Sequence, residues 1–202
     1  MEVMDAIKTR RSIRHYKPDA VTDETLNVVL EAARWAPSWA NTQCARFVVV
    51  RDKEIKAKLA DSLRPGNPAS GALNEAPMVI VACAELGKSG FTSGRAITGR
   101  DDWKVSITGK GDWHMFDVAL AMQNLVLAAH SLGLGTVLIG GFNPKDVAEI
   151  LYVPRGVEVV AMTPLGYPAR GGQTPSRLEL PEVVFRDNYG QNWVPARVRN
   201  HP

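Results

Sequence analysis

The chain carries an apolar stripe at helical spacing between residues 23 and 35. Leu26, Val29 and Ala33 recur at intervals of three and four residues, which is typical of the buried face of an amphipathic helix. Thr22 stands where the side chain of a capping residue accepts a hydrogen bond from the first helical turn. Comparable patterns predict further helices at residues 2–8, 52–63 and 143–151.

Short runs of β-branched residues lie between these helices and predict buried strands. The runs FVVVR (residues 47–51) and MVIVACA (residues 78–84) are almost wholly apolar, as expected for strands covered on both faces. Further strands are predicted at residues 136–139, 157–162 and 182–185. Because helices and strands alternate irregularly, the pattern favours an α+β fold with a mixed sheet over a doubly wound sheet.

Two stretches depart from this simple alternation. Residues 113–132 are predicted to form the longest helix, and apolar residues occupy nearly all of its faces. A helix of this kind is buried, either in the core or against a second subunit. Residues 85–111 are rich in glycine, carry mixed charge and lack periodicity, which indicates a functional lid or a mobile segment.

The composition is that of an ordinary globular domain. Of the 202 residues, 45% are hydrophobic and 22% are charged, which excludes a disordered, coiled-coil or collagen-like chain. No apolar run approaches the roughly 20 residues of a membrane span, and the charged residues 1–16 show no apolar signal core, so we expect a cytoplasmic protein without a membrane partner. We expect one domain over residues 1–185 and a polar C-terminal extension over residues 186–202.

Charge and cysteine spacing disfavour several kinds of binding site. The net charge is +3, and basic residues are mixed with acidic ones everywhere except at residues 8–17, which favours one local anion site over a nucleic-acid surface. Cys44 and Cys83 lie far apart and the histidines are scattered, so the sequence predicts no metal site. The glycine-rich motifs of dinucleotide and P-loop phosphate sites are also absent.

Two motifs could carry chemistry on their own residues. RRSIR (residues 10–14) offers three guanidinium groups and a hydroxyl at a turn, and such donors suit a phosphate dianion. PSWANTQ (residues 37–43) offers a hydroxyl, two carboxamides and an indole, which suit the edge of a heteroaromatic ring. The alternatives are a solvated basic turn for the first motif and an ordinary helix-to-strand loop for the second.

Two further features are weaker. In VLIGGF (residues 137–142), two glycines follow an apolar strand, where they let a backbone N–H approach a planar ligand or simply form a tight turn. Arg177 is a lone basic residue in a polar loop and indicates nothing by itself.

The order of these motifs adds to their meaning. RRSIRHY begins at residue 10, PSWANTQ follows the second helix, the long apolar helix leads into LGLGTVLIGGF, and LGYPA and PSRLELPEVVF close the series. In this order they resemble the FMN-dependent nitroreductase family, over residues 1–185. The resemblance implies an α+β fold with a largely antiparallel sheet, and an intertwined homodimer that binds FMN in the subunit interface. The helix at residues 113–132 would then be covered by its twin.

The resemblance also implies which residues hold FMN. Arg10 and Ser12 would hold the phosphate, with Arg11 contributing and Arg177 joining from the late loop. Arg14 would lie at the N1–C2 carbonyl edge of the flavin ring, where a fixed cation stabilises the reduced form. The residues implied to contact the ring are Ile139, Gly140 and Gly141 from one subunit, with backbone N–H groups at N5 and O4, and Pro37, Ser38, Trp39 and Asn41 from the other.

The implied reaction has two halves that use one site. NADH or NADPH gives a hydride to FMN and leaves, and a nitroaromatic, quinone or similar acceptor then takes its place. The flavin carries the chemistry, so no catalytic protein residue is expected. Residues that could stack on the ring or act as a lid are Trp39, Trp103, Trp113 and Phe142, with core or interface packing as the alternative for each.

The chain departs from the family pattern at two positions. Gly140 stands where many relatives carry an acidic residue, and Pro175 stands where many carry a lysine, so acceptor preference is not inherited. Two alternative functions are a specialised enzyme that modifies a flavin or dehalogenates an aromatic, and a flavin-binding redox sensor without turnover. The sensor would use residues 189–202 as a partner segment, whereas in an enzyme we expect the tail to wrap the second subunit.

Overall fold

The computed structural model describes residues 1–93, 104–106 and 109–193. The chain divides into two compact units, residues 1–172 and residues 173–202. The first unit contains the sheet and almost all of the helices that the structure describes.

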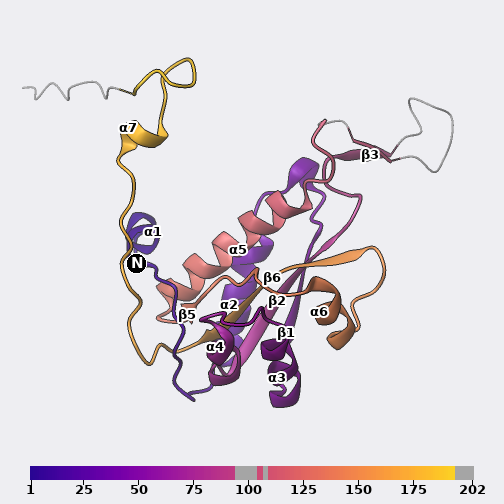
Figure 1. The fold of residues 1–202 in the computed structure, drawn as a ribbon, viewed down its shortest axis with the longest axis vertical. Helices are drawn as coiled ribbons and strands as arrows, with labels where there is room; N and C mark the ends of the chain where they lie inside the picture. Colours follow the sequence, from indigo (N-terminus) through magenta and orange to yellow (C-terminus); the bar gives the residue numbers. More distant parts are fainter. Residues whose placement is uncertain (94–103, 107–108, 194–202) are drawn as a thin grey trace, which may run out of the picture. The chain divides into compact units, whose positions relative to one another are not determined.

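A four-stranded sheet forms the centre of the first unit (Figure 1). Its strands lie in the order β1-β2-β6-β5, and each neighbouring pair is antiparallel. The strands are β1 (Ala45–Val50), β2 (Met78–Glu85), β5 (Gly135–Thr136) and β6 (Val157–Gly166). The predicted α+β fold with a largely antiparallel sheet is therefore confirmed.

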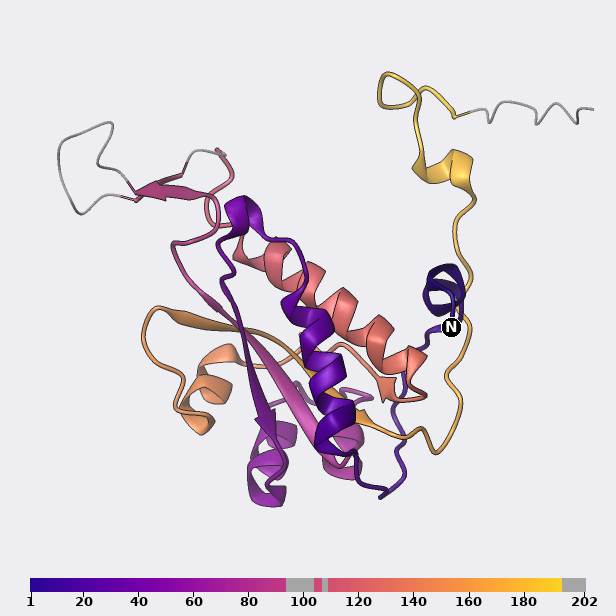
Figure 2. The same cartoon turned by 180° about the vertical axis from the view of Figure 1, so that it is seen from behind.

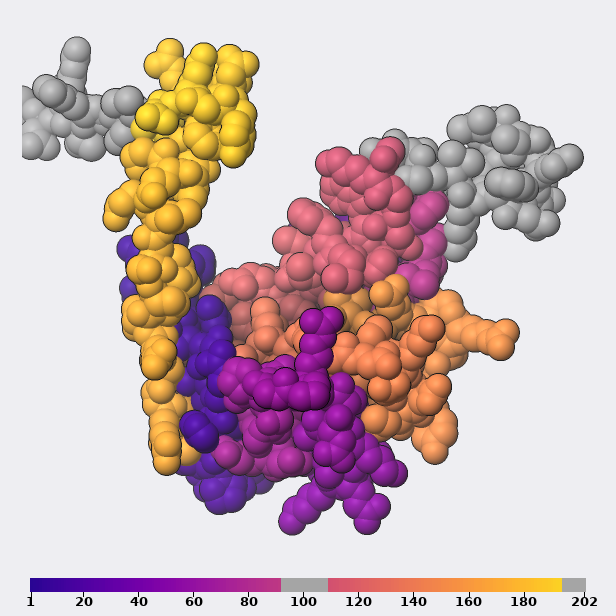
Figure 3. All heavy atoms as spheres, viewed as in Figure 1, coloured from indigo at the N-terminus to yellow at the C-terminus, as the bar shows by residue number. Residues whose placement is uncertain are grey.

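Helices cover both faces of this sheet. One face packs against α2 (Asp23–Arg34) and α5 (His114–Ser131), which lie in front of the strands in Figure 2. The other face packs against α3 (Lys53–Asp61), α4 (Ser70–Glu75) and α6 (Pro144–Ile150). Side chains of these three segments, in purple and orange, cover that face in Figure 3. The short α1 (Val3–Thr9) contacts α5.

Strand β2 explains why the unit has two hydrophobic clusters. Every residue from Met78 to Ala84 is buried, as its uninterrupted apolar sequence predicts. Successive side chains point to opposite faces of a strand. Ile80 and Ala82 accordingly belong to the cluster beneath α2 and α5, whereas Val79 and Val81 belong to the cluster beneath α3, α4 and α6.

Smaller elements complete the described chain. The turn η1 (Trp39–Asn41) follows α2, and β3 (Phe91–Ser93) pairs with β4 (Lys104–Ser106) in a separate two-stranded sheet. In the second unit, α7 (Leu180–Val183) precedes a bridge between Phe185 and Asn192. Neither β3, β4 nor α4 was predicted from the sequence, and much of the predicted lid at residues 85–111 lies outside the described residues.

Two of the predicted strands are wrong or too long. The segment predicted as a strand at residues 182–185 begins inside helix α7, where the Glu182 carboxylate accepts a hydrogen bond from the Glu179 N–H at 2.7 Å. Of the segment predicted as a strand at residues 136–139, only Thr136 belongs to a strand, β5. Farther along, Ile139 forms an isolated bridge with Met162. By contrast, β6 extends four residues beyond its predicted end at residue 162.

Candidate active site

The RRSIR motif runs beside β5 directly after α1. Ser12 forms a parallel bridge with Thr136, and the Ile13 N–H donates to the Thr136 carbonyl at 2.9 Å. Gly135 permits this close approach, because a Cβ at that position would lie 2.8 Å from the Ile13 Cβ. The buried Ile13 therefore anchors the motif to the sheet, and its neighbours Ser12 and Arg14 are left half-buried and exposed.

The first two arginines of the motif lie at the end of α1. Arg10 is half-buried and forms the helix C-cap, where its N–H donates to the Ala6 carbonyl at 3.0 Å. The Arg11 guanidinium donates to the Lys8 and Arg10 carbonyls, each at 2.7 Å, so it holds the helix end in place. Both side chains are thus attached to an ordered turn.

The glycines of VLIGGF follow the same edge of the sheet. Ile139 exchanges two backbone hydrogen bonds of 2.9 Å with Met162, and Gly141 accepts a hydrogen bond of 3.0 Å from the Arg64 N–H. Gly140, between them, is exposed, and a Cβ there would meet nothing within 4 Å. The structure therefore brings RRSIR and the glycine segment to one edge, joined by the pairing of Ser12 with Thr136.

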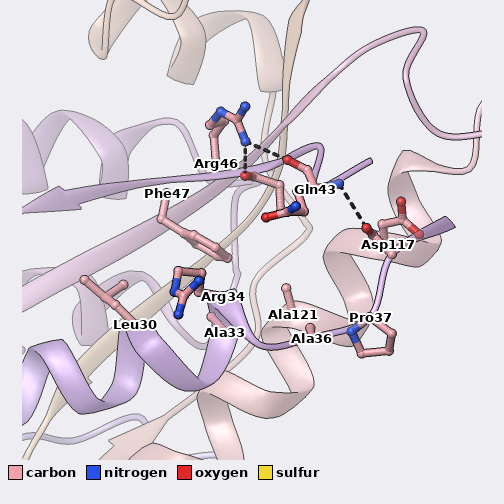
Figure 4. A pocket seen from close by; sticks show the side chains of 12 residues that line it. Leu30, Ala33, Arg34, Ala36, Pro37, Gln43, Arg46, Phe47, Asp117 and Ala121 are labelled. Atoms are coloured by element: carbon pink, nitrogen blue, oxygen red, sulfur yellow. Dashed lines mark hydrogen bonds between the residues drawn. The ribbon is translucent and has the colours of Figure 1, made fainter. Parts of the chain in front are cut away.

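A pocket of about 330 Å³ opens on a different part of the first unit. Its walls come from α2, α5 and the start of β1, and the Arg46 guanidinium donates to the Gln43 and Ala45 carbonyls at its rim, each at 2.8 Å (Figure 4). Of the predicted site residues it contains only Pro37 and Ser38. A second pocket, of about 430 Å³, is lined by Arg11 and His130 among others.

The PSWANTQ segment forms a strained turn. Ala40, Asn41 and Gln43 have φ angles of 45°, 55° and 48°, in the left-handed region that costs a non-glycine residue on the order of 1 kcal/mol or more. Ser38 holds the turn together, because its hydroxyl accepts from the Gln43 N–H at 2.9 Å and its carbonyl accepts from the Asn41 N–H at 3.0 Å.

A buried carboxylate on α5 lies beneath this turn. Asp117 is 2% exposed, and its Oδ1 accepts from the Trp39 N–H at 3.0 Å. Its Oδ2 lies 3.5 Å from both the Thr42 hydroxyl and the Cys44 thiol. Sequence reasoning missed Asp117, although a single acidic residue in an otherwise apolar helix was the available signal.

Within one chain, the two groups of predicted residues lie at opposite ends of α5. Trp39 contacts Asp117 near the start of the helix, and Thr9, next to RRSIR, contacts His130 near its end. Asp117 and His130 are 13 positions apart, which corresponds to about 20 Å along a helix. One chain alone therefore does not bring PSWANTQ and RRSIR together.

Aromatic side chains gather beside the turn. Trp39, Trp113 and Phe116 line a pocket of about 260 Å³, and the rings of Trp113 and Phe116 lie 5.2 Å apart. Phe142 is not available for stacking, because it is 7% exposed and packs in the core. Trp103 lies outside the described residues.

Arg177 belongs to the second unit. Its side chain is exposed, and Nη1 donates to the carbonyl of Ser176 at 3.1 Å. Its expected role beside Arg10 stays a prediction. Among the described residues, no group of three or more metal-ligating side chains gathers, and no helix has the length and apolarity of a membrane span.

Comparison with known proteins identifies the fold and the family. The sequence profile described as the Nitroreductase family matches residues 7–167. The chain belongs to the nitroreductase family. It is 32% identical to the FMN reductase [NAD(P)H] of Bacillus subtilis in an alignment of 193 residues, which covers 93% of this chain and 74% of that protein. It is also 32% identical to the NADH dehydrogenase of Thermus thermophilus in an alignment of 200 residues, which covers 92% of this chain and 96% of that protein.

A solved structure with bound FMN has a similar fold. The structure of a Desulfovibrio desulfuricans protein in complex with FMN matches with a TM-score of 0.69 and 30% identity, over 94% of this chain and 98% of that one. The nitroreductase matches include the RRSIR motif, the PSWANTQ turn and the glycine segment, all of which lie within residues 7–167.

Proposed function

We propose that the protein is an FMN-dependent oxidoreductase that takes a hydride from NADH or NADPH and reduces a nitroaromatic, quinone or similar acceptor. The observation that carries the proposal is the pairing of Ser12 with Thr136, which lines up the RRSIR donors with the glycine segment on one sheet edge. Membership of the nitroreductase family supports it, as does the FMN reductase activity in the name of a relative.

The residues on this edge fit the chemistry of FMN. Its phosphate needs charge-assisted donors, and Arg10, Ser12 and Arg11 offer them on an ordered turn. We place Arg177 at the phosphate as well. The exposed, side-chain-free surface at Gly140 leaves room for a planar ring to approach the backbone.

Bound FMN would supply the redox chemistry by accepting and passing on electrons at its ring. In our proposal Arg14 places a fixed positive charge near the ring, which favours the reduced, more negative form. The backbone hydrogen bonds of Ile139 with Met162 and of Gly141 with Arg64 hold the glycine segment in place, so that it would present backbone N–H groups to the ring. This reaction requires no nucleophile from the protein.

We infer that a second copy of the chain completes the site. In one chain, PSWANTQ lies about 20 Å along α5 from RRSIR, so Pro37, Ser38, Trp39 and Asn41 would reach the FMN of a partner chain. Helices α1 and α5 each expose large apolar side chains, which a partner chain could bury. These side chains are Val3, Met4 and Ile7 of α1 and Met115 and Phe116 of α5.

Residues 186–202 are proposed to extend from the domain at residues 1–185 and wrap the partner chain.

Trp39, Trp113 and Phe116 form an apolar pocket beside the turn, which suits a flat aromatic or quinone acceptor. Because NADH and NADPH are supplied in the cytoplasm, we place the activity there.

The experiment that tests this function is a titration of the purified protein with FMN, followed by addition of NADH or NADPH without oxygen. We expect flavin binding with bleaching of the flavin absorbance, and restoration of the absorbance by a quinone or nitroaromatic. Arg10→Ala should weaken FMN binding by about 2 kcal/mol, roughly 30-fold, because a charge-assisted hydrogen bond to the phosphate is lost.

Arg155→Ala is the matched control, because Arg155 is exposed and lies in the turn before β6, away from the motif. It should bind FMN like the parent protein. Protein that takes up no FMN would reject the function, and full FMN affinity in Arg10→Ala would remove Arg10 from the site.

A further inference from the structure

Asp117 is a buried acidic residue of α5 that lies outside the proposed FMN contacts. It is the single charged residue of α5 between His114 and Ser131, apart from the histidines, and it is buried. A buried carboxylate is unfavourable unless its oxygens are hydrogen-bonded. The donors around it are the Trp39 N–H, the Thr42 hydroxyl and the Cys44 thiol.

All three donors come from one short segment, residues 39–44. This segment contains the strained turn, whose left-handed residues Ala40, Asn41 and Gln43 persist only while neighbouring contacts hold them. Those contacts are of two kinds. Ser38 closes the turn on itself, whereas Asp117 attaches the turn to α5.

We propose that Asp117 is a positioning residue that fixes Trp39 and Asn41 for contact with the flavin of the partner chain. This inference rests on the proposed function, because it assumes that the turn reaches FMN. Asp117 itself does not touch the cofactor in this account. It sets the place of the turn relative to α5 through the Trp39 backbone.

The state of Cys44 supports the arrangement. Burial and the neighbouring Asp117 carboxylate raise the pKa of the Cys44 thiol to about 11. The thiol therefore keeps its proton at neutral pH and is a donor toward the carboxylate, not a competing anion. Residue 44 also begins the entry into β1, so the contact extends the attachment from the turn to the sheet.

The test compares three variants of the full-length protein. Asp117→Ala removes both carboxylate oxygens that face the turn and should weaken FMN binding at least about tenfold. Asp117→Asn should restore binding to within about threefold of the parent, because its oxygen still accepts from the Trp39 N–H and its amide can donate to the Thr42 hydroxyl. Thr163→Val is the control, a buried polar residue of β6 that lies outside the turn.

A second measurement does not use flavin at all. Backbone amide exchange of the peptide covering residues 36–44 should be faster in Asp117→Ala than in the parent, because the Trp39 N–H loses its acceptor. The same peptide should keep the parent rate in Thr163→Val. If Asp117→Ala fails to fold, Asp117→Ser takes its place, since a serine hydroxyl is too short to span the same contact.

The results separate the possible failures. FMN affinity and exchange at the parent level in Asp117→Ala would overturn the positioning role, as would equal losses of affinity in Asp117→Ala and Thr163→Val. Equal weakening by Asp117→Asn and Asp117→Ala would overturn the hydrogen-bond account. A parent protein that binds no FMN would instead reject the proposed function, while the exchange measurement would still report on the attachment of the turn.

Discussion

At the scale of single residues, the hydrogen bonds around His130 determine which ring nitrogen carries its proton. The Thr9 hydroxyl donates to the Asp5 carbonyl at 2.6 Å, so its one proton is already engaged. His130 Nε2 lies 2.8 Å from the same oxygen. The neutral His130 ring must therefore donate from Nε2, and the Thr9 oxygen accepts.

This environment disfavours a second proton on the ring. Burial, together with the positive charges of Arg10 and Arg11, lowers the pKa of His130 below its usual value. The unfolded chain takes up that proton more readily than the folded one as the pH falls through about 6.5. The contribution of neutral His130 to the free energy of unfolding is therefore fully present above that pH and declines below it.

We predict that His130→Gln flattens this pH dependence. Glutamine can present an amide N–H to the Thr9 oxygen but does not titrate, so the variant should lose less melting temperature between pH 7.5 and pH 5.5 than the parent. Thermal unfolding at both pH values measures the effect. Parallel losses in the two proteins would show that His130 makes no contribution to the acid sensitivity.

At the scale of elements, local signals predicted the starts of helices well. Thr22 was expected to cap one helix, and the helices predicted from residues 52 and 143 begin with Asp52 and Asn143. Each of these three side chains accepts a hydrogen bond from the first turn, at 3.2, 2.9 and 3.1 Å. These contacts span only two or three residues along the chain. The neighbouring residues therefore determine these contacts, and no tertiary contact is needed to predict them.

The elements that were missed depend on such context or are too short to show a period. Helix α4 has six residues, fewer than two turns, and was not predicted. At α7, Pro181 and the hydrogen bond from Glu179 to Glu182 start a helix in a segment whose valines favour a strand. At α7 the signal for a helix start was therefore weaker than the β-branched pattern that follows it.

The same limit applies to the candidate site. Each motif was found from its residues, but the register that pairs Ser12 with Thr136 joins segments over 100 positions apart and has no counterpart in local spacing. The attachment of the turn to Asp117 is likewise a long-range contact. The sequence thus identified the pieces of the site, and only the fold shows which of them share an edge.

A substitution at Gly135 tests whether the RRSIR segment packs closely against β5 through Ile13. A Cβ at residue 135 would lie 2.8 Å from the Ile13 Cβ, so Gly135→Ala should displace the segment from β5 and reduce the free energy of unfolding by about 1–3 kcal/mol. Gly171→Ala is the control, because a Cβ there would meet nothing within 4 Å. Urea unfolding measures both variants, and equal stabilities would contradict the close packing of Ile13 on β5.

At the scale of the whole molecule, the question is whether each site draws on two chains. Helix α5 holds RRSIR and PSWANTQ apart within one chain, so a two-fold dimer would form two sites, each combining RRSIR of one chain with PSWANTQ of the other. Consider a mixed dimer of one chain with a damaged RRSIR motif and one chain with a damaged PSWANTQ turn. One site of this dimer combines the two damaged segments, and the other site combines the two intact segments.

We predict that mixed dimers of Arg10→Ala and Trp39→Ala/Asn41→Ala chains regain the parent affinity for FMN, which neither variant has alone. Two affinity tags on the co-expressed chains allow the mixed species to be purified, and it should bind about half as much FMN per chain as the parent dimer at the parent affinity. If each site lay within one chain, every site of the mixed dimer would carry one defect and binding would stay weak. The recovered half-stoichiometry therefore distinguishes a shared site from an independent one, because no arrangement confined to single chains produces an intact site from these two variants.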